Sequence, residues 1–129
     1  MKTTKVTVLG LGYIGLPTAA LLSNNGYSVV GVDVNEFVVE SINTGESHIA
    51  EPGVDAIVRD VVTAGLLYAL TEPVAGDVYI ICVPTPFHND GGDVRPNIDY
   101  VLLATRSIAP LIKEGDLIIL ESTSPVGTT

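Results

Sequence analysis

The sequence predicts an α/β fold in which helices doubly wind a parallel sheet into three layers (α/β/α), within one domain spanning residues 1–129. Short apolar runs rich in β-branched residues alternate with longer segments of helical periodicity. This alternation is typical of parallel strands joined by right-handed crossovers. The run at 77–83 is apolar on both faces, as a central parallel strand requires. Apolar residues make up 47% of the 129 residues, enough to bury a core of this size.

Each element follows from its own pattern of apolar residues and stop signals. The expected strands cover residues 5–9, 28–33, 67–70, 77–83 and 117–120. The expected helices cover residues 13–25, 35–43 and 54–64, and a fourth that Asn97 or Asp99 caps and that runs to about Ile112. Residues 84–96 are expected to form a loop, because they contain three prolines and Gly91-Gly92. We expect the strand order 3-2-1-4-5.

Charge and cysteine content exclude several classes of function. Six basic residues stand against 15 acidic ones, which gives a net charge of −9. Such a surface repels phosphate backbones, so we expect neither a nucleic-acid partner nor an anionic membrane partner. The single cysteine allows no intrachain disulfide and belongs to no zinc-binding pattern, so we expect no metal site and a reducing, cytoplasmic compartment. The apolar run at 6–16 is too interrupted by glycines to be a signal peptide or a membrane span.

Residues 10–15 read Gly-Leu-Gly-Tyr-Ile-Gly, a GxGxxG motif directly between an expected strand and an expected helix. In this setting Gly10 permits the tight turn, Gly12 lets a pyrophosphate approach the backbone, and Gly15 lets helix and strand pack closely. The N–H groups at the helix start then face the phosphates. Kinase loops share the glycine pattern, but the lysine and HRD motifs of kinases are absent. We predict a Rossmann-type dinucleotide site; a purely structural glycine turn is the alternative.

Asp33 lies 18 positions after Gly15 and ends the second expected strand. A carboxylate at this position can accept hydrogen bonds from the adenosine ribose and would repel the 2′-phosphate of NADP. Residues 34–57 contain no lysine or arginine. The sequence therefore predicts NAD as the cofactor, while a helix cap is the alternative role for the carboxylate.

Further polar residues follow the later strands, whose carboxyl ends should also face the cofactor. Thr85 stands between two prolines, and Glu121 begins a polar segment at 121–127. Glu121 is either a second acid at the mouth of the site or merely the end of a strand. Cys82 lies in an apolar strand without a basic neighbour, which favours a packing role over a nucleophile. His88, Asp90 and Asp93 match no zinc or calcium spacing and fit a mobile turn. For His48 a solvated loop position is favoured.

Five motifs in order resemble the N-terminal domain of the UDP-glucose/GDP-mannose dehydrogenase family over the whole chain. They are Gly-Leu-Gly-Tyr-Ile-Gly-Leu-Pro at 10–17, Val-Asp-Val-Asn at 32–35, His-Ile-Ala-Glu-Pro-Gly-Val at 48–54, Val-Pro-Thr-Pro-Phe at 83–87 and Glu-Ser-Thr-Ser-Pro-Val-Gly-Thr-Thr at 121–129. The last two are most similar to the branch of the family that oxidises UDP-N-acetyl-D-mannosamine.

The resemblance implies an enzyme that oxidises the C6 hydroxyl of a UDP-sugar to a carboxylate with two NAD⁺. It implies NAD contacts from the glycine turn including Tyr13 and Ile14, from Asp33, and from Thr85 and Thr123. Some members carry a basic residue about one turn into the helix after the aspartate, where this chain has Val38. That departure concerns the strength of adenosine binding and leaves the choice of NAD unchanged.

The resemblance also implies what lies elsewhere in such enzymes. Their nucleophilic cysteine, their lysine and asparagine, and the helix that forms a homodimer all belong to parts further along the chain. We therefore expect residues 1–129 to be the NAD-binding portion of a longer, homodimeric UDP-sugar dehydrogenase and to be inactive alone. The oligomeric state of the portion itself stays open. A nucleotide-sensing regulatory module, which uses the same glycine turn without chemistry, is the alternative function.

Overall fold

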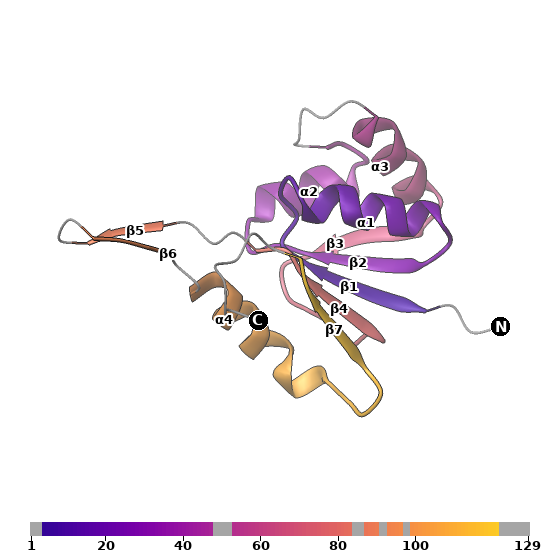
Figure 1. The fold of residues 1–129 in the computed structure, drawn as a ribbon. Helices are drawn as coiled ribbons and strands as arrows, with labels where there is room; N and C mark the ends of the chain where they lie inside the picture. Colours follow the sequence, from indigo (N-terminus) through magenta and orange to yellow (C-terminus); the bar gives the residue numbers. More distant parts are fainter. Residues whose placement is uncertain (1–3, 48–52, 84–86, 91–92, 97–98, 122–129) are drawn as a thin grey trace.

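The computed structural model describes residues 4–47, 53–83, 87–90, 93–96 and 99–121. Five parallel strands form one sheet in the order β3-β2-β1-β4-β7 (Figure 1). Their bounds are β1 Lys5–Leu9, β2 Ser28–Val32, β3 Leu67–Leu70, β4 Val78–Ile81 and β7 Leu117–Leu120. Numbered along the chain within this sheet, that order is 3-2-1-4-5, so the predicted topology and the α/β fold are confirmed.

Helices cover both faces of the sheet, as Figure 1 shows. Three of them lie on one face: α1 Gly15–Asn24, α2 Glu36–Asn43 and α3 Val54–Thr63. The helix α4 Asp99–Ile108 and a 3₁₀ turn at Ala109–Leu111 lie on the other. Side chains alternate along each strand, so Val8 packs against the three-helix layer while Leu9 packs against α4. The two cores therefore lie on the two faces of the sheet.

Local chemistry explains where the helices begin and end. Asn35 caps α2, because its Oδ1 accepts hydrogen bonds from the N–H groups of Phe37 at 3.0 Å and Val38 at 3.4 Å. Helix α1 ends at Asn24, and Gly26, just after the C-cap Asn25, has φ +97° and an N–H that donates to the Ser23 carbonyl. The predicted stop signal at the end of the first helix is thus confirmed.

Two predictions about residues 84–112 need correction. The loop expected at 84–96 contains an antiparallel hairpin, β5 Phe87–Asp90 and β6 Asp93–Pro96, in which Asp90 pairs with Asp93 (Figure 1). Gly-Gly between two short runs is itself a hairpin signal, but the prolines and charges around it obscured that reading. The last helix ends at Ile108 rather than near Ile112, because Pro110 lacks the N–H that would continue the α-helical ladder.

The described parts of the chain contain no helix with the length and apolar character needed to cross a membrane.

Candidate dinucleotide-binding site

The predicted glycine turn lies at the carboxyl end of β1, between the ends of its two neighbouring strands. The Gly10 N–H donates to the Val32 carbonyl of β2 at 2.7 Å. On the other side, the N–H of Cys82, just after β4, donates to the Leu9 carbonyl at 2.7 Å. Because all the strands are parallel, the ends of β2, β4 and β7 meet at this same edge. The turn therefore occupies the centre of the edge where ligands bind in such sheets.

Two of the three glycines in the turn are required by the protein itself. Gly10 has φ +93°, and a Cβ there would lie 2.8 Å from the Cys82 carbonyl oxygen. A Cβ on Gly15 would lie 1.7 Å from the Gly10 carbonyl oxygen. Gly10 needs glycine for its positive φ and its approach to the backbone after β4, and Gly15 needs it for the close approach of α1 to the turn.

Gly12 differs from its two neighbours. No other atom in the described chain lies within 4 Å of a Cβ built on it, and its φ is not in the left-handed region. The described residues therefore give no reason for glycine at this position. The open space lies at the start of α1, where a dinucleotide pyrophosphate would meet the backbone. The residues present fit NAD on this observation.

The first turn of α1 contains no acidic residue of its own. Its N-cap residue is Ile14, whose side chain caps nothing. The helix dipole thus places partial positive charge at the glycine turn, and no carboxylate of its own first turn neutralises it. An anionic group such as a pyrophosphate is stabilised by this arrangement.

Asp33 links the glycine turn to α2. Its Oδ2 accepts a hydrogen bond from the Leu11 N–H at 3.0 Å, and its Oδ1 accepts one from the Asn35 N–H at 2.9 Å. The cap of α2 is Asn35, so Asp33 supports the turn before the helix rather than capping it. An ionised carboxylate has about four lone-pair sites, and these two bonds leave room for ribose hydroxyls. The half-buried side chain can therefore hold the turn and still face a ligand.

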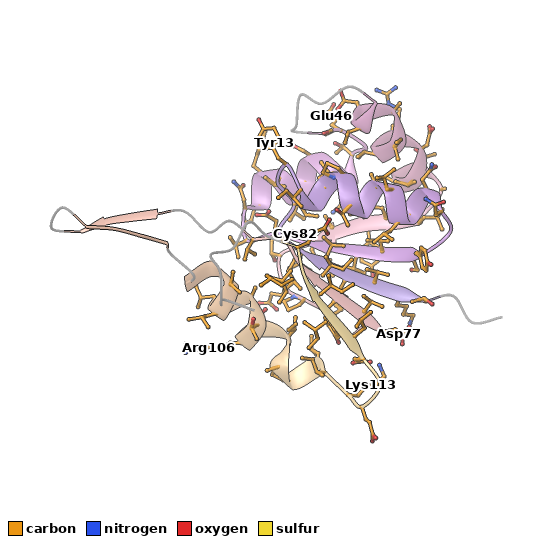
Figure 2. The ribbon with its side chains drawn as sticks, in the orientation of Figure 1. Tyr13, Glu46, Asp77, Cys82, Arg106 and Lys113 are labelled. Atoms are coloured by element: carbon orange, nitrogen blue, oxygen red, sulfur yellow. The ribbon has the colours of Figure 1, made fainter. Side chains whose placement is uncertain are left out.

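Exposed apolar side chains surround the turn and the residues after Asp33. Tyr13 is 77% exposed, Val34 90% and Phe37 71%. Figure 2 shows Tyr13 projecting away from the ribbon beside α1. Sequence reasoning predicted Tyr13 but missed Val34 and Phe37. The signal was available, because Phe37 is out of phase with the buried α2 residues, which are Val38, Val39 and Ile42.

Glu121 and Cys82 meet at the opposite side of the turn. The Thr18 hydroxyl of α1 lies 3.1 and 3.2 Å from the two carboxylate oxygens of Glu121. The Cys82 thiol donates to Glu121 Oε2 at 3.6 Å. Burial, the negative charge of Glu121 and this hydrogen bond, in decreasing order of effect, together raise the pKa of Cys82 to about 12. The thiol stays protonated at neutral pH, which supports its predicted packing role.

Several predicted residues lie outside the described part of the chain. They are Thr85, Thr123 and His48, so their roles stay predictions. Thr18 was missed by sequence reasoning, because its partner Glu121 is 103 positions away. Within the described residues, no group of three or more His, Cys, Asp or Glu side chains is placed to hold a metal ion.

Comparison with known sequences gives a consistent match. The sequence model described as "UDP-glucose/GDP-mannose dehydrogenase family, NAD binding domain" matches residues 4–129. UDP-N-acetyl-D-mannosamine dehydrogenase from Campylobacter jejuni is 54% identical over 125 residues, covering 97% of this chain and 30% of the relative. The protein of the same name from Escherichia coli K12 is 51% identical over 129 residues, covering 100% of this chain and 30% of the relative. The chain thus spans about 30% of the length of these relatives.

Solved structures agree with this match. The UDP-N-acetyl-mannosamine dehydrogenase Cap5O from Staphylococcus aureus superposes with a TM-score of 0.86 at 42% identity, over 93% of this chain and 29% of that one. The UDP-D-ManNAc dehydrogenase from Pyrococcus horikoshii superposes with a TM-score of 0.89 at 41% identity, over 97% of this chain and 30% of that one.

Proposed function

The chain belongs to the UDP-glucose/GDP-mannose dehydrogenase family and matches the NAD-binding domain of that family. We propose that it binds the NAD of an enzyme that oxidises UDP-N-acetyl-D-mannosamine to the uronic acid. The substrate is inferred from the names of the relatives at 51–54% identity. The observation that carries the proposal is the open space at Gly12, which no side chain of the described residues fills. Asp33 beside it supplies a carboxylate where a ribose is expected.

Each group at the edge of the sheet has a distinct task in this proposal. The glycine turn and the start of α1 bind the pyrophosphate through backbone N–H groups and the helix dipole. Asp33 accepts hydrogen bonds from the ribose hydroxyls and repels a 2′-phosphate, so the site selects NAD over NADP. Thr85 and Thr123 are proposed to contact the cofactor nearer its nicotinamide end. When bound, NAD supplies the acceptor for the hydride that leaves C6 of the sugar.

The remaining chemistry is assigned to parts of the enzyme beyond residues 1–129. Oxidation to a carboxylate needs a base for the C6 hydroxyl and a thiolate that attacks the intermediate aldehyde. Cys82 cannot supply that thiolate, because its pKa is raised to about 12 and its side chain is buried. We propose that the catalytic groups, the sugar-binding domain and the dimer interface lie in the portion of the relatives that this chain does not span. We further propose a cytoplasmic enzyme of polysaccharide biosynthesis.

Titration calorimetry with NAD and NADP tests the proposed cofactor site. We expect NAD to bind more tightly than NADP, because Asp33 repels the 2′-phosphate. In Asp33→Ala, NAD binding should weaken by about 1–3 kcal/mol, the range for a lost charge-assisted hydrogen bond, and the preference for NAD should narrow.

The matched control is Asp60→Ala, which removes an equal charge from the exposed surface of α3 and should leave both affinities unchanged. Equal affinity for the two cofactors in the wild-type chain, or tighter binding of NADP, would contradict the assignment of Asp33.

A further inference from the structure

The carboxylate of Glu121 is held by three elements at the carboxyl-end edge of the sheet. Glu121 follows β7 directly, and its N–H donates to the Ile81 carbonyl of β4 at 2.9 Å. Its two carboxylate oxygens lie 3.1 and 3.2 Å from the Thr18 hydroxyl of α1, and one of them accepts from the Cys82 thiol at 3.6 Å. Both neighbouring groups are neutral donors. They fix the position of the carboxylate without cancelling its charge.

No cation compensates this charge within the described part of the chain. Among the residues described there, neither a lysine nor an arginine pairs with Glu121. Lys113 pairs with Asp77, just before β4, and with Asp116, just before β7, at the opposite end of these strands from Glu121 (Figure 2). Glu121 is also exposed to solvent. Within the described residues, this edge of the sheet therefore carries a fixed negative charge with no lysine or arginine as its ion-pair partner.

The strand order places this charge on the nicotinamide side of the proposed site. Asp33 follows β2, on one side of the glycine turn, and Glu121 follows β7, on the other side beyond β4. A dinucleotide that binds with its adenosine ribose at Asp33 crosses the turn with its pyrophosphate and extends its other half toward β4 and β7. This step depends on the function proposed above. Glu121 also lies two positions before Thr123, the residue expected near that end of the cofactor.

We propose that Glu121 is a selectivity residue that favours binding of the oxidised cofactor over the reduced one. The nicotinamide ring is cationic in NAD⁺ and neutral in NADH, whereas the pyrophosphate and adenosine are the same in both. A fixed negative charge near the ring attracts NAD⁺ and has no such attraction for NADH. In an enzyme that uses two NAD⁺ for each sugar, this bias favours departure of the first NADH and entry of the second NAD⁺.

The test is the ratio of the dissociation constants of NADH and NAD⁺, measured by titration calorimetry on the wild-type chain and on Glu121→Gln. Glutamine keeps the shape of the side chain and can still accept from Thr18. We expect the ratio to shift toward NADH by about threefold to tenfold in Glu121→Gln, from the loss of one nearby charge interaction. Glu114→Gln removes an equal charge from the exposed turn before β7 and should leave the ratio unchanged.

A second measurement needs no variant. In the wild-type chain the preference for NAD⁺ should narrow as the ionic strength rises from about 0.01 M to about 1 M, because the Debye length falls from about 30 Å to about 3 Å. An unchanged ratio in folded Glu121→Gln, or equal changes in both affinities, overturns the inference, as does a ratio in the wild type that is insensitive to salt. Failure of the wild type to bind either form overturns the proposed cofactor site itself.

Discussion

Cys82 illustrates how single residues at the edge of the sheet are controlled by their neighbours. Its thiol is buried and donates to Glu121, and the structure raises its pKa from 9.0 to about 12. A thiol that stays protonated is a poor nucleophile. The same contact holds the Glu121 carboxylate beside Cys82, just after β4. In this pair Glu121 supplies a carboxylate in a fixed position, and Cys82 is an unreactive packing residue.

The raised pKa makes a prediction about reactivity. At pH 9, where a thiol of ordinary pKa would be half ionised, we expect iodoacetamide to modify Cys82 of the folded protein far more slowly than that of the protein unfolded in urea. Glu121→Gln should raise the rate in the folded state, because one cause of the shift is removed. Mass spectrometry of timed samples measures both rates. Equal rates in the folded and unfolded protein would show that the thiol is not protected.

The raised pKa of Cys82 also makes the free energy of unfolding depend on pH. The pKa of Cys82 is higher in the folded than in the unfolded chain, so its contribution to stability is complete below pH 9. That contribution is lost progressively as the pH rises from 9 toward 12, because only the unfolded chain releases the proton. In Cys82→Ser this part of the decline in the free energy of unfolding between pH 9 and pH 12 should be absent.

Asn43 shows how one side chain completes an element at the edge of the sheet. The Asn43 amide of α2 donates to the Ala69 carbonyl at 2.9 Å, and its Oδ1 accepts from the Ala69 N–H at 2.7 Å. Ala69 is buried in β3, the edge strand, where these backbone groups have no neighbouring strand to bind. The amide therefore substitutes for a strand and closes the edge to further pairing.

Removing this amide should destabilise the domain. In Asn43→Ala we expect the free energy of unfolding to fall by about 1–3 kcal/mol, because two buried backbone groups lose their partners. Urea denaturation followed by circular dichroism measures the change. Asn24→Ala, at the exposed end of α1, removes the same amide without this contact and is the control. A loss in Asn43→Ala no larger than in the control would contradict the role of the amide.

At the scale of the whole molecule, the sequence was sufficient for features that depend on local periodicity. Strand order, the glycine turn and the position of Asp33 all follow from short apolar runs and the spacing of the motif. Contacts between distant residues could not be predicted in this way. Asn43 and Ala69 are 26 positions apart, and Thr18 and Glu121 are 103 apart. Neither pair has a periodic signature, because each depends on how finished elements pack together.

The separation of cofactor binding from chemistry is a prediction about the whole chain. Residues 1–129 should bind NAD but should oxidise none of the three sugars UDP-N-acetylmannosamine, UDP-glucose and GDP-mannose. Absorbance at the NADH band measures turnover with each sugar, for the wild type and for Cys82→Ser. Turnover that Cys82→Ser removes would contradict the inert thiol, and turnover that survives the substitution would place a catalytic group within these residues.

The central claim is that NAD binds at the open backbone of the glycine turn. Gly12→Val places a branched side chain in that space, where, apart from the adjacent residues, no atom of the described chain lies within 4 Å of the Cβ position, so the chain should still fold. The deciding measurement is calorimetric titration of NAD into folded Gly12→Val and into Asn24→Val, which places the same branched side chain at the far end of α1. We predict no detectable NAD binding by Gly12→Val and wild-type affinity for Asn24→Val. Wild-type affinity in Gly12→Val, with an unchanged circular dichroism spectrum, would contradict the account.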